Sequence, residues 1–395
     1  MRRKLPVRDV DVHGKRVFVR VDFNVPLDAD GHVTDDTRIR ASLPTIEYLL
    51  DHGAAVILAS HLGRPKGKVV ESMRLAPAAE SLSQRLSVPV QMAPDSIGPE
   101  VEATARALAP GQVLLLENLR FHPEEEANDD DFSRRLAGLA DRYVDDAFGS
   151  AHRAHASTVG VACLLPSSAG LLMQAELDTL GGALDDPERP FIVIIGGAKI
   201  SSKIAVLQHL LTRADSFLIG GGMANTLLKA HGVDVGASLV EDDKLDVACD
   251  FLESAEAAGI PVHLPSDAIV ATAVAQEAER KTVQVDETPA GWRIVDIGPQ
   301  TIRDFRDVIK DAGTILWNGP MGVFEVPAFA NGTREVARLV ADSHAKSIVG
   351  GGDSVAAVEQ MGVADRMTHV STGGGAALEF LEGRVLPGVA VLPDA

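Results

Sequence analysis

The sequence has few cysteines and few aromatic residues. Its 395 residues include two cysteines, Cys163 and Cys249, and no Cys-x-x-Cys pair, which excludes a disulfide framework and a cysteine-rich zinc site. Aromatic residues make up 4% of the chain, so we expect a core built mainly from Ala, Val, Ile and Leu. The apolar and charged fractions, 46% and 24%, are ordinary for globular proteins and exclude a wholly disordered or collagen-like chain.

Long apolar runs and a positive charge balance are also lacking. No run approaches the roughly 18 apolar residues of a membrane-spanning helix, and the charged first residues lack the apolar segment of a secretory signal. The net charge of −19 repels phosphate backbones. We therefore predict a cytoplasmic protein with no membrane partner and no nucleic-acid partner.

Two common nucleotide-binding motifs are absent. The segment Gly63–Lys68 has the wrong spacing for G-x-x-x-x-G-K-[ST]. No G-x-G-x-x-G opens the first strand–helix unit with an acidic residue placed for a ribose. These absences argue against an ordinary P-loop NTPase and against a dinucleotide-dependent dehydrogenase.

Short apolar runs alternate with helical patterns along the chain. The runs predicted as strands are 16–21, 55–59, 113–116, 191–195, 216–219, 314–317 and 346–349. The predicted helices are 37–52, 174–184, 202–212, 353–360 and 376–382. Continuous apolar runs are typical of parallel strands covered on both faces. The pattern predicts an α/β protein with two doubly wound, Rossmann-like parallel-sheet domains that face a cleft and are joined by a helix.

The predicted domain boundary follows a polar, proline-punctuated stretch. Residues 185–190 read DDPERP and separate a helical segment from a new apolar strand. We predict an N-terminal domain over residues 1–173, an interdomain helix and linker over 174–190, and a C-terminal domain over 191–383.

In the first half, polar side chains follow the predicted strands. Ligands bind beyond the carboxyl ends of the strands in such sheets, and arginine suits phosphate and carboxylate groups. The candidates for a site that binds a small, multiply anionic ligand are Asp22, Asn24, Arg38, His61, Arg64, Arg120 and Arg153. The alternative is a set of surface arginines in scattered ion pairs. The H-x-x-H spacing of His152 and His155 favours hydrogen-bonding histidines near an anion over a metal pair.

In the second half, glycine clusters follow the predicted strands. They stand at 196–197, 220–222, 350–352 and 373–375, with Lys199 and Lys203 beside the first. Glycine lets a backbone approach phosphates closely, and a helix start offers free N–H groups to anions. Asp353 beside such a loop could hold Mg²⁺. The glycines could instead serve only tight turns, but their number together with two lysines favours a nucleotide site. An anion site and a nucleotide site together suggest phosphoryl transfer across a cleft.

These segments resemble the phosphoglycerate kinase family. The matching motifs, in order, are RVDFNVP at 20–26, HLGRP at 61–65, ENLRF at 117–121, AHRAHAS at 151–157, GGAKISSK at 196–203, WNGPMGVFE at 317–325, GGGDS at 350–354 and STGGG at 371–375. The resemblance runs from about residue 7 to residue 390. It implies a glycolytic and gluconeogenic kinase that converts 1,3-bisphosphoglycerate and MgADP into 3-phosphoglycerate and MgATP.

The resemblance also implies roles for the candidate residues. Asp22, Asn24, Arg38, His61, Arg64, Arg120 and Arg153 would hold phosphoglycerate, with Arg38 also against the transferring phosphoryl group. Lys199 would follow that group, and Gly373, Gly374 and Gly375 would offer it backbone N–H donors. Nucleotide binding falls to Lys203, Gly351, Gly352, Asp353 and Ser354, with Asp353 also at Mg²⁺. Glu325 would contact the ribose, and Gly222, Pro320 and Val323 would line the adenine pocket.

Several further expectations rest on the same resemblance. The acceptor is a carboxylate that is already deprotonated, so no general base or covalent enzyme intermediate is expected. Two half-sites on two domains imply hinge closure before chemistry. The last residues, about 384–395, would return to the first domain, and His369 would contact the hinge or cap a local turn. We expect a monomer. The alternative is a catalytically silent protein that binds nucleotide and phosphoglycerate.

Overall fold

The computed structural model describes residues 2–395, and the chain divides into two compact units. Unit 1 comprises the chain up to Asp178 together with Val385–Ala395, and unit 2 comprises Thr179–Arg384. The helix α7 (Leu171–Asp185) contains the point of division. No helix in the described part of the chain is both long and apolar enough to cross a membrane.

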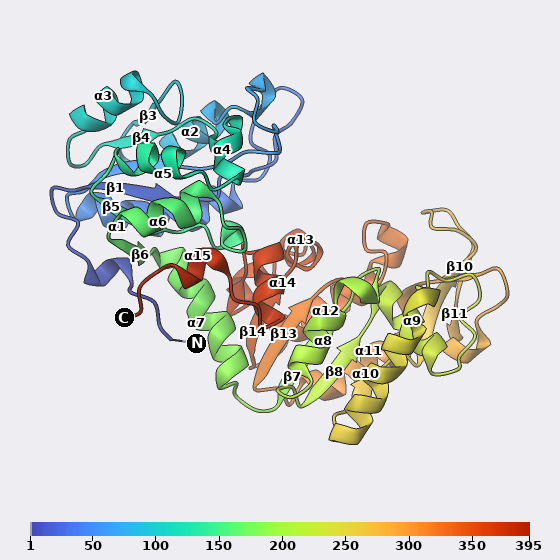
Figure 1. Cartoon of the computed structure of the whole chain (residues 1–395). Helices are drawn as coiled ribbons and strands as arrows, with labels where there is room; N and C mark the ends of the chain where they lie inside the picture. The colour runs from blue at the N-terminus through green and yellow to red at the C-terminus, as the bar shows by residue number, and fades with distance from the viewer. Residues whose placement is uncertain (1) are drawn as a thin grey trace. The chain divides into compact units, whose positions relative to one another are not determined.

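Unit 1 is built on a six-stranded parallel sheet in the order β3-β4-β2-β1-β5-β6 (Figure 1). Its strands are β1 (Arg16–Arg20), β2 (Ala55–Ala59), β3 (Val90–Met92), β4 (Val113–Leu115), β5 (Arg142–Asp145) and β6 (Ser167–Ala169). Every residue of β2 is buried, because an uninterrupted Ala-Val-Ile-Leu-Ala run has helices to pack against on both faces. The central strands therefore form a rigid base for the loops at their carboxyl ends.

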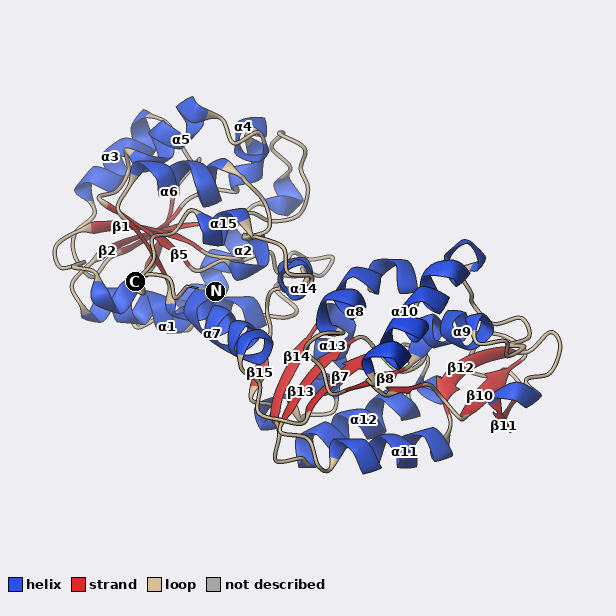
Figure 2. Ribbon diagram, turned by 60° about the horizontal axis from the view of Figure 1, so that its bottom comes forward, coloured by secondary structure: helices blue, strands red, loops and turns tan. Residues whose placement is uncertain are grey.

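The helices of unit 1 lie on the two faces of this sheet. They are α1 (Thr37–Asp51), α2 (Ala76–Ser83), α3 (Pro99–Ala107), α4 (Pro123–Glu126), α5 (Asp130–Ala137), α6 (Val161–Leu164) and α15 (Pro387–Ala390). Figure 2 shows α1 on the side opposite α3 and α5. Ile39, Ile46 and Leu49 of α1 join Val17 and Val19 of β1 in one buried cluster. Short turns of 3₁₀-helix add η1 (Val7–Asp9), η2 (Glu71–Met73), η3 (Leu119–Phe121) and η4 (Phe148–Ser150), and η5 (Ala156–Gly160) is a π-turn.

Unit 2 has a second six-stranded parallel sheet in the order β15-β14-β13-β7-β8-β9. The strands are β7 (Phe191–Ile195), β8 (Ser216–Ile219), β9 (Val262–His263), β13 (Thr314–Asn318), β14 (Lys346–Gly350) and β15 (His369–Val370). The helices are α8 (Ile204–Leu210), α9 (Gly221–Ala230), α10 (Leu245–Ala258), α11 (Pro299–Ile309), α12 (Asn331–Asp342), α13 (Gly352–Gln360) and α14 (Gly375–Leu381). Figure 2 shows α8 and α10 on one face of the sheet and α11 and α12 on the other. The 3₁₀ turns of unit 2 are η6 (Ile200–Ser202), η7 (Asp242–Lys244), η8 (Val285–Glu287), η9 (Pro327–Phe329) and η10 (Ala364–Arg366).

The predicted α/β fold with two parallel sheets is confirmed, and the runs predicted as strands all contain strands. One sheet was not predicted. Strands β10 (Asp267–Ala271), β11 (Arg280–Gln284) and β12 (Arg293–Ile297) form an antiparallel sheet in the order β11-β10-β12. Strand β11 reads RKTVQ and is almost wholly exposed, so it lacks the apolar run by which the other strands were found. The predicted helix 202–212 is also shorter, because the 3₁₀ turn η6 ends at Ser202 and α8 begins at Ile204.

Candidate functional site

The predicted anion-binding residues of unit 1 gather at one edge of its sheet. Asp22 follows β1, His61 follows β2, Arg120 lies in η3 after β4, and Arg153 lies beyond η4 after β5. These four strands are consecutive neighbours in the order β4-β2-β1-β5, and all of them are parallel. Their carboxyl ends therefore lie side by side, and this is the edge at which doubly wound sheets bind ligands.

Direct contacts join several of these residues. Arg38, from the first turn of α1, donates to Asp22 Oδ2 at 2.7 Å. The backbone N–H of Gly63 donates to Asn24 Oδ1 at 2.8 Å, and Arg120 Nη1 donates to the Gly63 carbonyl at 2.8 Å. Gly63 therefore ties the loop after β1 to the turn after β4. Arg64, the next residue, is exposed.

Positive charge accumulates around buried side chains in this region. Arg120 is 4% exposed, and burial, followed by the nearby Arg153, lowers its pKa to about 10. Burial and then the charges of Arg20, Arg120, Arg38 and Arg153 hold the pKa of His61 well below its ordinary value. Burial together with the charge of Arg120 lowers the pKa of His155 to about 3. Both histidines are neutral at physiological pH, and the arginine charge around them suits an anionic ligand.

Asn118 organises this half-site, although its role was not predicted. Its Oδ1 accepts from the backbone N–H groups of Leu62 and Arg120, at 3.2 and 3.1 Å. Its Nδ2 donates to the carbonyls of Leu62 and Met73, both at 2.8 Å. Asn118 and Arg120 both belong to the ENLRF motif, but Leu62 and Met73 lie 56 and 45 positions away in the sequence. Only the tertiary structure shows that one amide fixes the backbone beside two of the predicted anion-binding residues, His61 and Arg120.

In unit 2, glycines bring three loops together backbone to backbone. A Cβ atom at Gly196 would lie 2.0 Å from the carbonyl oxygen of Pro320, and one at Gly319 would lie 2.2 Å from that of Gly196. A Cβ at Gly222 would lie 2.7 Å from the carbonyl oxygen of Ala198. The loops after β7 and β13 and the start of α9 can approach this closely only without side chains. The predicted adenine-pocket positions Gly222, in the first turn of α9, and Pro320, in the loop after β13, thus both pack against the glycine loop after β7.

Lys203 and Asn318 form the polar centre of this half-site. Lys203 Nζ donates to Asn318 Oδ1, and burial lowers the pKa of Lys203 while the Asp353 carboxylate opposes that shift. Asn318 is 2% exposed, and its buried Nδ2 has no hydrogen-bond partner within the described residues. A buried amide donor beside a lysine suits a phosphate oxygen. Asn318 lies inside the WNGPMGVFE motif but was not singled out from the sequence.

The remaining phosphate-loop residues differ in exposure. Lys199 and Asp353 are exposed, and Asp353 lies in the first turn of α13. Ser354 is fully buried, and its hydroxyl accepts from the backbone N–H of Gly319. Ser354 therefore anchors the loop after β13 through a buried hydrogen bond. Gly351, with φ of +88°, immediately precedes α13, and Gly352 is its first residue.

The three glycines at the start of α14, Gly373, Gly374 and Gly375, are not equivalent. The N–H of Gly373 already donates to Ser371 Oγ at 3.1 Å. Gly374 has φ of +50°, and α14 begins at Gly375. His369 lies in β15, which pairs with β14. Of the predicted donors, the N–H groups of Gly374 and Gly375 are thus the better candidates for a ligand.

The predicted nucleoside loop lies against a buried carboxyl group. Val323 donates its backbone N–H to the Val295 carbonyl at 2.8 Å, while Glu325 is exposed. Asp296 is the carboxyl group behind this loop. Its Oδ2 accepts from the N–H of Gly332 at 2.7 Å, and a Cβ at Gly322 would lie 2.4 Å from its Oδ1. Burial raises the pKa of Asp296 to about 7. Asp296 thus bonds the start of α12 and lies against the loop at Gly322.

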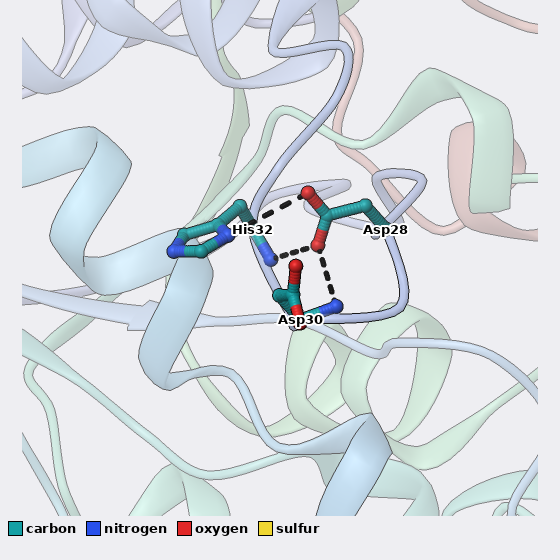
Figure 3. A group of neighbouring side chains, drawn as sticks. All are labelled: Asp28, Asp30 and His32. Carbon is teal, nitrogen blue, oxygen red and sulfur yellow. Dashed lines mark hydrogen bonds and ion pairs between the residues drawn. The ribbon is translucent and has the colours of Figure 1, made fainter.

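One acidic group in the described part of the chain has the spacing of a metal site, and it includes none of the predicted residues. The ligand atoms of Asp28, Asp30 and His32 lie within 4.8 Å of one another, and all three residues are exposed (Figure 3). Asp28 Oδ1 accepts from the N–H groups of Asp30 and His32, at 2.9 and 2.8 Å. These bonds close a local turn and account for the cluster without an ion.

The arginine cluster of unit 1 and the glycine loops of unit 2 fit the class of phosphotransferases with a small anionic substrate. The phosphoglycerate kinase family model matches residues 7–384. The chain belongs to the phosphoglycerate kinase family.

Curated relatives and solved structures agree with this assignment. The chain is 60% identical over 391 residues to a phosphoglycerate kinase of Moorella thermoacetica, covering 99% of each chain. It is 59% identical to one of a Roseiflexus species, covering 99% of this chain and 100% of the relative. The solved phosphoglycerate kinase of Coxiella burnetii matches with a TM-score of 0.89 and 42% identity over 98% of both chains. That of Pyrococcus horikoshii matches with a TM-score of 0.83 and 35% identity, covering 99% of this chain and 98% of that one.

Proposed function

We propose that this kinase transfers a phosphoryl group reversibly between 1,3-bisphosphoglycerate and ADP, giving 3-phosphoglycerate and ATP, with the two half-sites described above. The assignment is supported most by one observation in unit 1. The charges of Arg38, Arg120 and Arg153 all act on the buried, neutral His61. A small polyanion would offset this concentration of positive charge.

In unit 1, we assign phosphoglycerate to Asp22, Asn24, Arg38, His61, Arg64, Arg120 and Arg153. The arginines would pair with its phosphate and carboxylate oxygens, and neutral His61 would add a hydrogen bond. Arg38 is partly exposed at the start of α1, so its guanidinium is free to leave Asp22 for the transferring phosphoryl group. Charge on that group is spread over three oxygens during transfer, and arginine is the side chain best suited to it.

In unit 2, we assign the nucleotide phosphates to Lys203 and to the loops before α13 and α14. Asn318 Nδ2 would donate to a phosphate oxygen, which would satisfy a buried donor that has no protein partner. Exposed Lys199 has the freedom to follow the transferring group, and Gly374 and Gly375 would offer it backbone N–H donors. We assign the ribose to Glu325 and the adenine pocket to Gly222, Pro320 and Val323.

The residues present suit a magnesium ion held together with the nucleotide. Mg²⁺ is commonly bound by one carboxylate, substrate phosphates and water, and Asp353 is an exposed carboxylate beside Lys203. Asp353 would be its protein ligand. The ion, when bound, would neutralise charge on the nucleotide phosphates.

The chemistry of the reaction sets two further requirements. In the direction that consumes ATP, the acceptor is a carboxylate, which is ionised near neutral pH and needs no general base. The acyl phosphate product reacts with water, so water must be excluded during transfer. Because the assigned half-sites belong to separate units, we propose that the units close on each other during the catalytic cycle. We also propose a monomeric, cytoplasmic enzyme.

Replacing Arg38 tests this assignment. We expect Arg38→Ala to lower kcat by about 10²- to 10³-fold, as the loss of one donor to a developing charge does in other enzymes. Arg40→Ala is the matched control, because Arg40 lies on the same helix in an exposed ion pair with Asp36. Phosphorylation of 3-phosphoglycerate by MgATP is followed by a coupled assay, and circular dichroism verifies the fold. Equal turnover in both variants would remove Arg38 from the catalytic site.

A further inference from the structure

Arg20 is a buried side chain that contacts His61, one of the predicted anion-binding residues. It is the last residue of β1 and is 1% exposed. Its Nη2 lies 3.1 Å from His61 Nδ1, and its Nε donates to Ser157 Oγ at 2.8 Å. Its Nη1 donates to the Val21 carbonyl. The guanidinium is therefore held on three sides, and one of its nitrogens is directed at the His61 ring.

The chemistry of arginine decides which ring nitrogen of His61 carries the proton. A guanidinium has five N–H donors, no acceptor, and stays protonated in proteins. A contact between Arg20 Nη2 and His61 Nδ1 therefore requires Nδ1 to accept, which leaves the proton of the neutral ring on Nε2. We propose that Arg20 is a positioning residue that holds His61 as the Nε2–H tautomer, so that His61 presents a hydrogen-bond donor to phosphoglycerate. The second half of this proposal rests on the ligand placement proposed above.

The groups around His61 keep its ring neutral. Arg20 faces it from β1, Arg38 from α1, Arg120 from η3, and Arg153 from the segment after η4. Asp22 is paired with Arg38 at 2.7 Å. Burial and these four positive charges hold the pKa of His61 well below its usual range, so the ring gains no second proton as the pH falls through 6.5. His61 is thus a donor of fixed direction across the physiological pH range.

A buried carboxyl group anchors Arg20 from its other side. The Ser157 hydroxyl, which accepts from Arg20, donates to Glu125 Oε1 at 2.6 Å. The backbone N–H of Ser157 donates to Glu125 Oε2 at 3.0 Å. Glu125 is fully buried in α4. Ser157 therefore links the guanidinium to Glu125, and this link fixes the Arg20 side chain independently of any ligand.

The tautomer of His61 can be measured directly in the ligand-free enzyme. We would label the histidines with ¹⁵N and record long-range ¹H–¹⁵N spectra from pH 6 to pH 8, with His61→Gln to assign the resonances among 12 histidines. We expect an unprotonated Nδ1, a protonated Nε2 and no titration over this range. A proton on Nδ1, or a ring charged near neutral pH, would overturn the proposal without any Arg20 variant.

Variants of Arg20 separate positioning from a general structural role. We expect Arg20→Met to release the tautomer into a mixture and to weaken 3-phosphoglycerate binding by at least about tenfold, an order of magnitude typical of a lost charge-assisted hydrogen bond. Arg20→Lys, which keeps a charged donor, is expected to retain the Nε2–H form. Arg16→Met is the matched control on the same strand, because Arg16 pairs with Asp141 and not with His61. An unchanged His61 spectrum in Arg20→Met would overturn the proposal.

Ligand titration distinguishes the two parts of the proposal. If 3-phosphoglycerate leaves the Nε2 resonance of wild-type His61 unmoved, the ligand placement is wrong, whatever the tautomer. If the ligand moves that resonance but Nδ1 carries the proton, the placement stands and the role of Arg20 is refuted. The two failures therefore give different spectra.

Discussion

Asp146 offers a test of how a buried carboxyl group holds the start of the helix that leaves unit 1. It is 0% exposed and follows β5. Its Oδ1 accepts from the N–H groups of Leu172 and Met173 in the first turn of α7, at 2.9 and 3.4 Å. Burial raises the pKa of Asp146 to about 8. The folded protein therefore prefers this carboxyl group protonated.

The raised pKa has a definite effect on stability. A group whose folded pKa lies above its unfolded pKa stabilises the fold below the unfolded value, near 4, and loses that contribution as pH rises through the folded value. Each pH unit between the two costs about 1.4 kcal/mol of folding free energy. Between pH 5.5 and pH 7.5, ionisation of Asp146 should thus cost unit 1 about 3 kcal/mol. Asp146→Asn keeps an oxygen acceptor for the helix and removes this cost.

The assay compares wild type, Asp146→Asn and Asp146→Ala at both pH values. Hydrogen-exchange mass spectrometry of β1 and β5 peptides across a urea series gives the unfolding free energy of unit 1, with labelling times corrected for pH. We expect Asp146→Asn to gain about 3 kcal/mol on wild type between pH 5.5 and pH 7.5. Asp146→Ala should be destabilised at pH 5.5, because it loses both hydrogen bonds to α7. Parallel pH profiles for wild type and Asp146→Asn would refute a raised pKa at this position.

Two further substitutions test how each half-site is held together. Gly319 has φ of +101°, and Gly319→Ala would place a Cβ 2.2 Å from the Gly196 carbonyl oxygen. We therefore expect the affinity for ATP, measured by calorimetry, to fall by at least about tenfold, and the affinity for 3-phosphoglycerate to stay unchanged. Unchanged ATP affinity would show that the glycine loops need not approach so closely. Asn118→Ala removes the hydrogen bonds that fix Leu62 and Arg120, and we expect the KM for 3-phosphoglycerate to rise more than that for ATP. Equal effects on both substrates would contradict a local role for Asn118.

Much of the fold could be predicted because its buried strands are continuous apolar runs. AVILA and FIVII became β2 and β7 with the predicted boundaries. The antiparallel sheet was missed for the converse reason. Strand β11 is stabilised by pairing with β10, and its own side chains bury little apolar surface. Tertiary context determines such a strand, and local pattern carries little of that information.

The residues that follow strands could be predicted from the sequence, whereas the residues that support them through hydrogen bonds could not. Asp22, His61 and Arg120 follow strands, so the rule for parallel sheets was enough to place them together. Arg20 and Asn118 act through hydrogen bonds to residues more than 40 positions away. No periodicity or spacing encodes those partners. Ser354 was predicted to bind nucleotide because it lies in a glycine-rich motif. In the structure it is buried and accepts from the backbone N–H of Gly319, so it supports a neighbouring loop.

The dependence of turnover on each reactant tests the central claim most directly. Conversion of 3-phosphoglycerate by ATP is measured in a coupled assay with wild-type enzyme, with and without 3-phosphoglycerate, ATP and Mg²⁺. We predict turnover only when all three are present. In this account 3-phosphoglycerate is the phosphoryl acceptor, ATP is the donor, and Mg²⁺ at Asp353 neutralises charge on the nucleotide phosphates. A folded protein that binds both substrates without turnover, or that consumes ATP without 3-phosphoglycerate, would contradict the account.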